Sequence, residues 1–299
     1  MKTALLTILV LLTFVLPVKS QTDTFALHTY GLAGPVRTVR TETATIVERN
    51  GHSVEGPRIL SMTITFNEDI NRTEVCFYDA IGVLSRRIVN KYDGKRDTEY
   101  LNYTGKGNIW LRGTSEYDEK GQRVGGATYY GDGTLRSRSF IKRNNYGQVV
   151  EYSTVDPNGT LLEKFVTSYG DDAGILSIER SYYRPDGSLR SRELFNAKTR
   201  RLETMNYNPD GTLAGSSVHI DQNIKEYGKN GALTKSIQVG DIGLLLDEST
   251  FSANGSSRRV TSTPDELDSH GNWIKQTKWV SDRRGRRAVS ITYREITYY

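Results

Sequence analysis

Tyr-Arg-Pro-Asp-Gly-Ser-Leu at residues 183–189 decides the fold, because variants of this phrase recur between residues 117 and 233. They read Tyr-Asp-Glu-Lys-Gly at 117–121, Tyr-Gly-Asp-Gly-Thr-Leu at 130–135, Asp-Pro-Asn-Gly-Thr-Leu at 156–161 and Tyr-Asn-Pro-Asp-Gly-Thr-Leu at 207–213. The Pro presets φ near about −65° at the second turn position, and the Gly takes the left-handed conformation that closes a hairpin with a bulge. Each copy is therefore predicted to be a hairpin turn.

These turns sort onto the two edges of a sheet. Gly133, Gly159, Gly187 and Gly211 are spaced 26, 28 and 24 residues apart, and Gly121, Gly147, Gly174 and the turn at 198–200 alternate with them. The 12 to 15 residues between neighbouring turns leave strands of roughly nine residues, on the order of 30 Å long. A chain that reverses at every turn predicts an all-β fold, an elongated antiparallel up-and-down meander of repeated hairpins with little helix.

The N-terminal segment has a different character. Lys2 precedes an apolar run over 4–15, and Val-Lys-Ser at 18–20 is a plausible cleavage site. This pattern predicts a secretory signal peptide, with an N-terminal membrane anchor as the alternative. No second apolar run is long enough to span a bilayer, so the mature chain is expected to have no transmembrane segment and to be secreted or periplasmic.

The rest of the chain is predicted to be a single β-repeat domain. Its parts are N-terminal cap strands at 21–77, a hairpin repeat array at 78–235 and C-terminal cap strands at 236–299, after a signal peptide at 1–20. The caps are expected to blunt the ends of a long sheet. Within the C-terminal part, the polar segment 252–265 is expected to form a long exposed loop. Cys76 is the only cysteine, so no internal disulfide framework exists, and its strand-like surroundings predict a small buried side chain.

Catalytic motifs are missing from this sequence. It contains no zinc-protease helix signature, nucleophile elbow, phosphate loop or dinucleotide fingerprint. The densest set of metal-ligand residue types, Asp265, Glu266, Asp268 and His270, lacks the spacing of a calcium loop. We therefore expect no cofactor, no metal and no enzyme, although paired carboxylates on the sheet leave a hydrolase open.

Two surfaces are candidates for binding. The first is a ligand platform made of tyrosines that recur along the sheet beside Arg, Asp and Asn residues: Tyr130, Tyr152, Tyr169, Tyr183 and Tyr207. Tyrosines beside polar residues suit saccharide rings or extended peptides, whereas the alternative is that they stack on cross-strand neighbours and bind nothing. The second is a patch for an anionic partner on a predicted turn: Arg283, Arg284, Arg286 and Arg287. Its alternative is a solvated hairpin tip.

The repeats, with their Tyr-x-x-x-Gly-x-Leu core, resemble the YD/RHS-type repeats of exported bacterial proteins and, loosely, MORN-type hairpin repeats. Three flanking segments look like the ends of small secreted RHS-like proteins of unknown function: Gly-Leu-Ala-Gly-Pro-Val-Arg-Thr-Val-Arg at 31–40, His-Gly-Asn-Trp-Ile-Lys at 270–275 and Arg-Glu-Ile-Thr-Tyr-Tyr at 294–299. The chain lacks the Pro-rich boundary and the toxin domain of the large RHS proteins. The resemblance implies fold and export, and it carries over no catalytic residue.

The sequence thus predicts an exported, non-catalytic protein that binds carbohydrate or a cell-envelope protein. A secreted or periplasmic hydrolase and a purely structural envelope protein are the alternatives. The net charge of +5 comes from basic residues scattered among acidic ones, so nucleic acid is not an expected partner.

Overall fold

A computed structural model describes residues 32–172, 175–239, 245–252 and 256–299. The predicted signal peptide at 1–20 and the turn glycine Gly174 lie outside the described residues. The described residues form twenty strands and no helix. The strands are β1 (Val36–Arg49), β2 (His52–Phe66), β3 (Arg72–Tyr78), β4 (Leu84–Asp93), β5 (Arg96–Thr104), β6 (Ile109–Tyr117), β7 (Arg123–Tyr130), β8 (Leu135–Arg143), β9 (Val149–Val155), β10 (Leu161–Asp172), β11 (Ile175–Tyr183), β12 (Leu189–Asn196), β13 (Arg201–Tyr207), β14 (Leu213–Ile220), β15 (Asn223–Gly228), β16 (Leu233–Val239), β17 (Leu245–Phe251), β18 (Ser257–Leu267), β19 (Trp273–Asp282) and β20 (Gly285–Tyr298).

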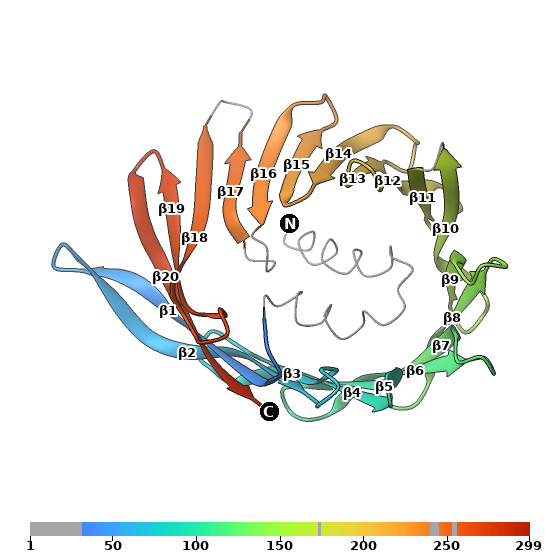
Figure 1. Ribbon diagram of the computed structural model, residues 1–299, viewed down its shortest axis with the longest axis horizontal. Helices are drawn as coiled ribbons and strands as arrows, with labels where there is room; N and C mark the ends of the chain where they lie inside the picture. The colour runs from blue at the N-terminus through green and yellow to red at the C-terminus, as the bar shows by residue number, and fades with distance from the viewer. Residues whose placement is uncertain (1–31, 173–174, 240–244, 253–255) are drawn as a thin grey trace.

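The sheet closes on itself. Each strand pairs antiparallel with the next one in the chain, and β20 pairs with β1 over nine residue pairs, from Val36 opposite Tyr298 to Thr45 opposite Ser290. The result is a closed ring of strands (Figure 1). The predicted all-β meander is therefore correct in its connections, but the predicted open, elongated sheet is wrong. The two segments expected to cap free edges supply β1 and β20, and pairing them leaves the sheet without a free edge.

The turn chemistry is confirmed. Gly133, Gly159, Gly187 and Gly211 have φ values of 86°, 85°, 82° and 82°. At the turn before β12, the Gly187 amide donates to the Arg184 carbonyl at 2.9 Å, and the Arg184 amide donates to the Ser188 carbonyl at 2.8 Å. A register shift follows at Leu189, as expected for a bulged hairpin. These turns lie on one rim of the barrel, and those of Gly121 and Gly147 lie on the other.

The predicted loop at 252–265 is wrong over most of its length. Strand β18 starts at Ser257 and pairs with β17 on one side and β19 on the other. Residues in β18 do not alternate between apolar and polar, but a strand needs this alternation only where one of its faces packs against a hydrophobic core. Here the cross-strand hydrogen bonds and the ion pair between Arg259 and Asp247 (Nε to Oδ2, 2.7 Å) hold a polar strand in place.

The two faces of the wall follow from the register, since directly opposed residues share a face. Val39 of β1 lies opposite Ile64 of β2, and Ile64 lies opposite Val75 of β3. All three pack with Leu32 in the main hydrophobic cluster, and the segment that leads into β1 lies inside the ring (Figure 1). We call this face the inner face and the opposite one the outer face.

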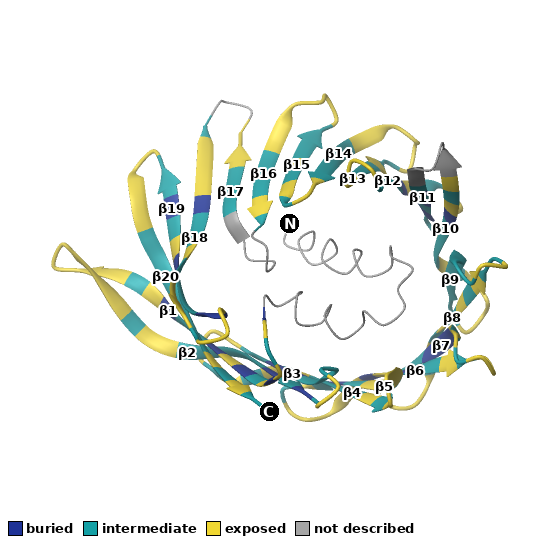
Figure 2. Cartoon of the chain, in the orientation of Figure 1, coloured by how far each residue is buried: buried dark blue, intermediate teal, exposed yellow. Residues whose placement is uncertain are grey.

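Burial is concentrated in one sector of this barrel. The hydrophobic cluster covers β1 to β3, whereas most other strands are half-buried or exposed (Figure 2). Cys76 is 7% exposed on the outer face of β3, which confirms a small buried side chain. Burial and the neighbouring Glu74 carboxylate raise the pKa of its thiol, so it is a poor nucleophile.

Substitution of Gly187 by Val is expected to destabilise the protein by more than about 1 kcal/mol, because a β-branched residue is strained at positive φ. Apart from the two residues next to it in the chain, no described residue has an atom within 4 Å of a Cβ built on this glycine. The effect therefore isolates backbone strain from steric clash. The measurement is the free energy of unfolding in urea. Gly187→Asn is the matched control, since Asn tolerates the left-handed region, and it should lose clearly less stability. Equal melts for Gly187→Val and wild type would contradict the left-handed turn.

Candidate functional site

Charged side chains occur at mid-wall on both faces of the barrel. On the inner face, Arg180 lies 4.0 Å from Glu193, and Lys235 lies 3.4 Å from Glu248. On the outer face, Arg40 and Glu42 pair within β1, and further ion pairs run from strand to strand: Arg87–Glu74, Lys142–Glu151, Lys164–Glu151 and Arg192–Glu179, at 2.6 to 3.1 Å. Such exposed pairs add little stability each. Their consequence is that neither face is a continuous apolar surface.

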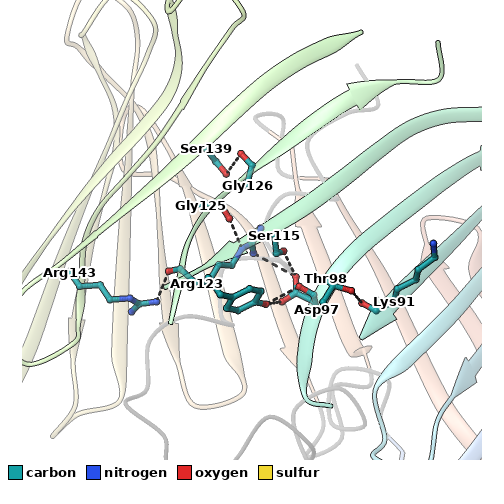
Figure 3. Close-up of polar contacts among 10 residues, drawn as sticks. Lys91, Asp97, Thr98, Ser115, Arg123, Gly125, Gly126, Ser139 and Arg143 are labelled. Carbon is teal, nitrogen blue, oxygen red and sulfur yellow. Dashed lines mark hydrogen bonds and ion pairs between the residues drawn. The ribbon is translucent and has the colours of Figure 1, made fainter. Parts of the chain in front are cut away.

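A repeated side-chain contact closes the open ends of successive hairpins. Tyr92, Tyr117 and Tyr169 each donate a hydroxyl hydrogen bond to the backbone carbonyl twenty residues earlier, at 2.8 to 3.0 Å. Arg143 makes the equivalent bond to the Arg123 carbonyl at 3.3 Å (Figure 3). These residues end one strand of a hairpin and reach back to the start of the other. Tyr117, which belongs to the repeat, and Tyr92 and Tyr169, which do not, therefore have a structural role in these hairpins.

The Tyr117 contact shows the electrostatics of these bonds. Its hydroxyl also donates to Asp97 Oδ1 at 2.6 Å. Ser115 donates to the other carboxylate oxygen at 3.0 Å (Figure 3). Burial, followed by the negative charge of Asp97, raises the pKa of Tyr117 to about 12. The phenol stays protonated and keeps donating at any physiological pH.

The five predicted platform tyrosines do not share one surface. Tyr130, Tyr152 and Tyr169 lie on the inner face, whereas Tyr183 and Tyr207 lie on the outer face, as the register of their strands requires. The Tyr169 hydroxyl is used in closing its hairpin. The Tyr207 hydroxyl contacts Met205 Sδ at 3.6 Å on the same outer face.

Tyr130 and Tyr152 belong to a set of aromatic rings on the inner wall, which we call the inner aromatic face: Tyr100, Tyr130, Tyr152 and Phe165. The Tyr152 and Phe165 rings stack with their centres 5.2 Å apart. This is the cross-strand stacking expected under the alternative that the tyrosines pack on neighbouring strands. Tyr130 is 46% exposed and Tyr100 is 37% exposed. Small residues, including Gly113, Ser137 and Ser139, lie on the inner face of the intervening strands β6 and β8.

Tyr100 is the member that the sequence did not reveal. A Cβ built on Gly113, its cross-strand partner, would come within 2.0 Å of the Tyr100 ring, so the ring lies flat over the glycine. Its hydroxyl is 3.5 Å from Thr128 Oγ1. A ring held flat with one side open to the interior offers a stacking surface for an apolar sugar face. The glycine in the middle of β6 was the available signal, because strand glycines often mark close approaches.

Next to this face lies a buried charged cluster. Arg180 and Tyr182 are 4% and 3% exposed, and the Arg180 guanidinium is 4.9 Å from the centre of the Phe165 ring. Arg180 Nε donates to Thr167 Oγ1, and the Tyr182 hydroxyl donates to Glu193 Oε2, each at 3.1 Å. Burial raises the pKa of Glu193, because loss of hydration outweighs the Tyr182 hydrogen bond and the Arg180 charge.

This pKa shift predicts a pH dependence of stability. A carboxyl group with a raised pKa in the folded state stabilises the fold below its unfolded pKa of about 4.5, and this contribution is lost as the pH rises through the folded pKa. Glu193→Gln keeps an acceptor for Tyr182 but cannot ionise. Wild type should therefore lose stability relative to Glu193→Gln between about pH 4.5 and neutrality, as measured by thermal unfolding. Glu179→Gln, on the outer face, is the control. A constant difference across this range would contradict the burial effect.

A second buried charge lies near the seam. Arg294 of β20 lies opposite Thr41 on the inner face, and its guanidinium is 3.6 Å from the centre of the Trp273 ring. Its Nε and Nη1 are buried and have no hydrogen-bond partner among the described residues, and the same is true of Thr41 Oγ1. Burial alone lowers the pKa of Arg294 to about 10. Contact with an aromatic face is worth up to about 2 kcal/mol, whereas each orphaned buried donor costs about 1–3 kcal/mol.

Arg294→Met is therefore expected to raise the free energy of unfolding, by about 1–4 kcal/mol, because Met keeps packing on Trp273 without the buried charge. Urea unfolding at pH 7 measures the change. Arg40→Met, on the exposed outer face, is the control and should change stability by less than about 1 kcal/mol. A loss of stability in Arg294→Met would mean that the guanidinium has a net favourable environment.

The structure divides the predicted arginine patch. Arg283 and Arg284 are exposed at the tip of the β19–β20 hairpin. Arg287 instead pairs with Asp282, with Nη2 at 2.9 Å from Oδ2, and Arg286 lies 4.5 Å from the Trp279 ring centre. At the other rim, the Asp268 carboxylate accepts hydrogen bonds from the backbone amides of His270 and Asn272, each at 2.9 Å, and from the Tyr298 hydroxyl. Among the described residues, no group of His, Cys, Asp or Glu could hold a metal ion.

Across the part of the chain that the structure describes, there is no helix with the length and apolarity needed to span a bilayer.

Comparisons with known proteins give weak likenesses of fold. No family model and no curated protein sequence matches this chain. Among solved structures, it is similar to a porin-like protein from Bacteroides uniformis, with 11% identity over 89% of this chain and 98% of that one, at a TM-score of 0.35. It is also similar to the Tc holotoxin pore of Photorhabdus luminescens, with 10% identity over 83% of this chain and 16% of that one, at a TM-score of 0.25. Scores this low carry no functional argument, and they leave the YD/RHS repeat assignment unsupported.

Proposed function

We propose that this protein is an exported, non-catalytic barrel that binds carbohydrate on its inner aromatic face and has water on both sides of its wall. The observation that carries this proposal is that both faces of the wall have paired charges at mid-wall, among the inner-facing and among the outer-facing residues of the strands. A barrel that faces lipid needs an apolar outer band about 25 Å tall. Arginine or lysine at the middle of such a band would cost about 2–4 kcal/mol each.

The inner aromatic face supports carbohydrate as the ligand. Tyr100 and Tyr130 keep 37% and 46% of their surface exposed, and they stand on strands whose inner residues are otherwise small or polar. Exposed rings among hydroxyl and amide groups match the alternating apolar faces and hydroxyl edges of sugars. Tyr152 and Phe165 stack on each other at a different level of the same inner wall, where Tyr152 lies opposite Ile141 of β8. Tyr183 and Tyr207 face outwards and are not part of this site.

The test is binding of the full chain to an array of neutral and acidic bacterial and plant glycans. Tyr100→Ala and Tyr130→Ala should each weaken binding to the best glycan by about tenfold, equivalent to about 1.4 kcal/mol of lost stacking. Tyr183→Ala and Tyr207→Ala are matched controls that remove the same ring from the outer face, and their affinity should stay within about twofold. Thermal melts of all four variants show whether the barrel is retained.

Two results would overturn the proposal. The first is the absence of any glycan binding, or an equal loss in the inner and outer variants. The second is a requirement for detergent during purification together with ion conductance in planar bilayers, which would assign the barrel to a membrane pore.

A further inference from the structure

A polar cleft lies between two neighbouring hairpins at one rim of the barrel. The β17–β18 hairpin and the β19–β20 hairpin point to the same rim (Figure 1). The cleft between them has a volume of about 480 Å³, and its lining includes Thr250, Ser257, Arg258, Asp282, Arg283 and Arg284. Every one of these side chains is a hydroxyl, a guanidinium or a carboxylate.

The register of β18 and β19 creates this cleft. Arg259 lies opposite Ser281, so the preceding residue, Arg258, lies beside Asp282 and the arginine turn. The Ser252 amide donates to the Ser256 carbonyl at 2.9 Å, which holds the base of the neighbouring hairpin closed. Arg258 is 25 residues from Arg283 in the sequence, and the paired strands bring them together.

The charge of this cleft is unbalanced. Asp282 is its one carboxylate, and it already accepts bonds from Arg287 Nη1 and Nη2 at 3.1 and 2.9 Å and from the Arg284 amide at 2.8 Å. These donors, Arg287 first, and the positive charges of Arg287 and Arg284 lower the pKa of Asp282 to about 2, so it is ionised. The guanidinium groups of Arg258, Arg283 and Arg284 make no hydrogen bond or ion pair with any described residue and are exposed.

We propose that this rim cleft binds the oxyanion substituents of an acidic polysaccharide, through Arg258, Arg283 and Arg284. Guanidinium groups bind carboxylate, sulfate and phosphate oxygens through paired hydrogen bonds. Three exposed guanidinium groups from two hairpins suit an anion presented at this rim, and the Thr250 and Ser257 hydroxyls add partners for sugar hydroxyls. This inference deepens the proposed carbohydrate-binding function and rests on it.

Like-charged neighbours also explain why an external anion is favoured. Each exposed guanidinium raises the positive potential felt by the other two, and a bound oxyanion relieves that repulsion. Arg287 does not share this role, because it is paired with Asp282 and senses the negative charge of Glu48 on β1. Arg286 is held over the Trp279 ring. The three unpaired arginines are therefore the members of the site.

The experiment measures binding of the full chain to polygalacturonate, dextran sulfate and neutral dextran by biolayer interferometry at several NaCl concentrations. We expect binding to one or both polyanions, no binding to dextran under the same conditions, and weakening as salt rises. The polygalacturonate and dextran sulfate arms separate carboxylate from sulfate ester as the preferred group. Inorganic phosphate, added as a free competitor, shows whether an isolated oxyanion is sufficient.

Variants assign the binding to the cleft. Arg258→Ala, Arg283→Ala and Arg284→Ala should each reduce polyanion affinity by about fivefold or more, and Arg284→Lys should retain part of it. Arg138→Ala is the matched control, because Arg138 is an exposed outer arginine on β8, far from the rim cleft along the sheet. It should change affinity by less than about twofold.

The outcomes separate this inference from the proposed function. Equal effects of Arg138→Ala and the cleft variants, or no polyanion binding at all, would overturn the cleft. Tyr100→Ala and Tyr130→Ala report on the inner aromatic face in the same assay with neutral glycans. If Tyr100→Ala and Tyr130→Ala lose glycan binding while the cleft variants bind the polyanions as wild type does, the proposed function is supported and the cleft is rejected. Binding that requires vesicles of anionic phospholipid would instead indicate a membrane surface and would also reject the polysaccharide.

Discussion

The hydrogen bonds between β1 and β20 are the interaction on which this structure depends. They join the two ends of the described chain over nine residue pairs and turn a meander into a barrel. Further contacts across the seam support them: the Tyr299 hydroxyl donates to the Phe66 carbonyl at 2.6 Å, and Asn272 Nδ2 donates to the Ala33 carbonyl at 2.9 Å. The main hydrophobic cluster lies in this same sector. Closure and core formation thus support one another, and the remaining strands need only pair with their neighbours.

The thin wall shapes what the protein can do. Outside the seam, few residues are buried, so the wall is held by backbone bonds, by side chains that close hairpins, and by cross-strand pairs. Both faces are then free to carry polar and charged groups. The inner aromatic face and the rim cleft both use this freedom. The first places rings over small residues such as Gly113, and the second collects arginines that have no partner within the described fold.

In each candidate site, the sequence pointed to some of the residues and not to others. Tyr130, Arg283 and Arg284 stand in or beside turns, where a local pattern singles them out. Tyr100 and Arg258 do not, because the first becomes a platform only through Gly113 on the next strand, and the second joins the arginine turn only through the register of β18 with β19. The same register divides the predicted tyrosines between the two faces. Local chemistry identified the candidate residue types, while cross-strand pairing chose their companions.

The sequence by itself determined the turns, their alternation between two rims and the antiparallel order of the strands. These follow from local rules: a Gly at positive φ, a Pro before it and a strand of fixed rise between turns. Only the tertiary structure decided that the sheet closes, which side of each strand faces inwards, and that residues 257–267 form a strand. Closure depends on the accumulated twist and curvature of twenty strands. Because twist and curvature add up over all the strands, closure cannot be inferred from any single segment of the sequence.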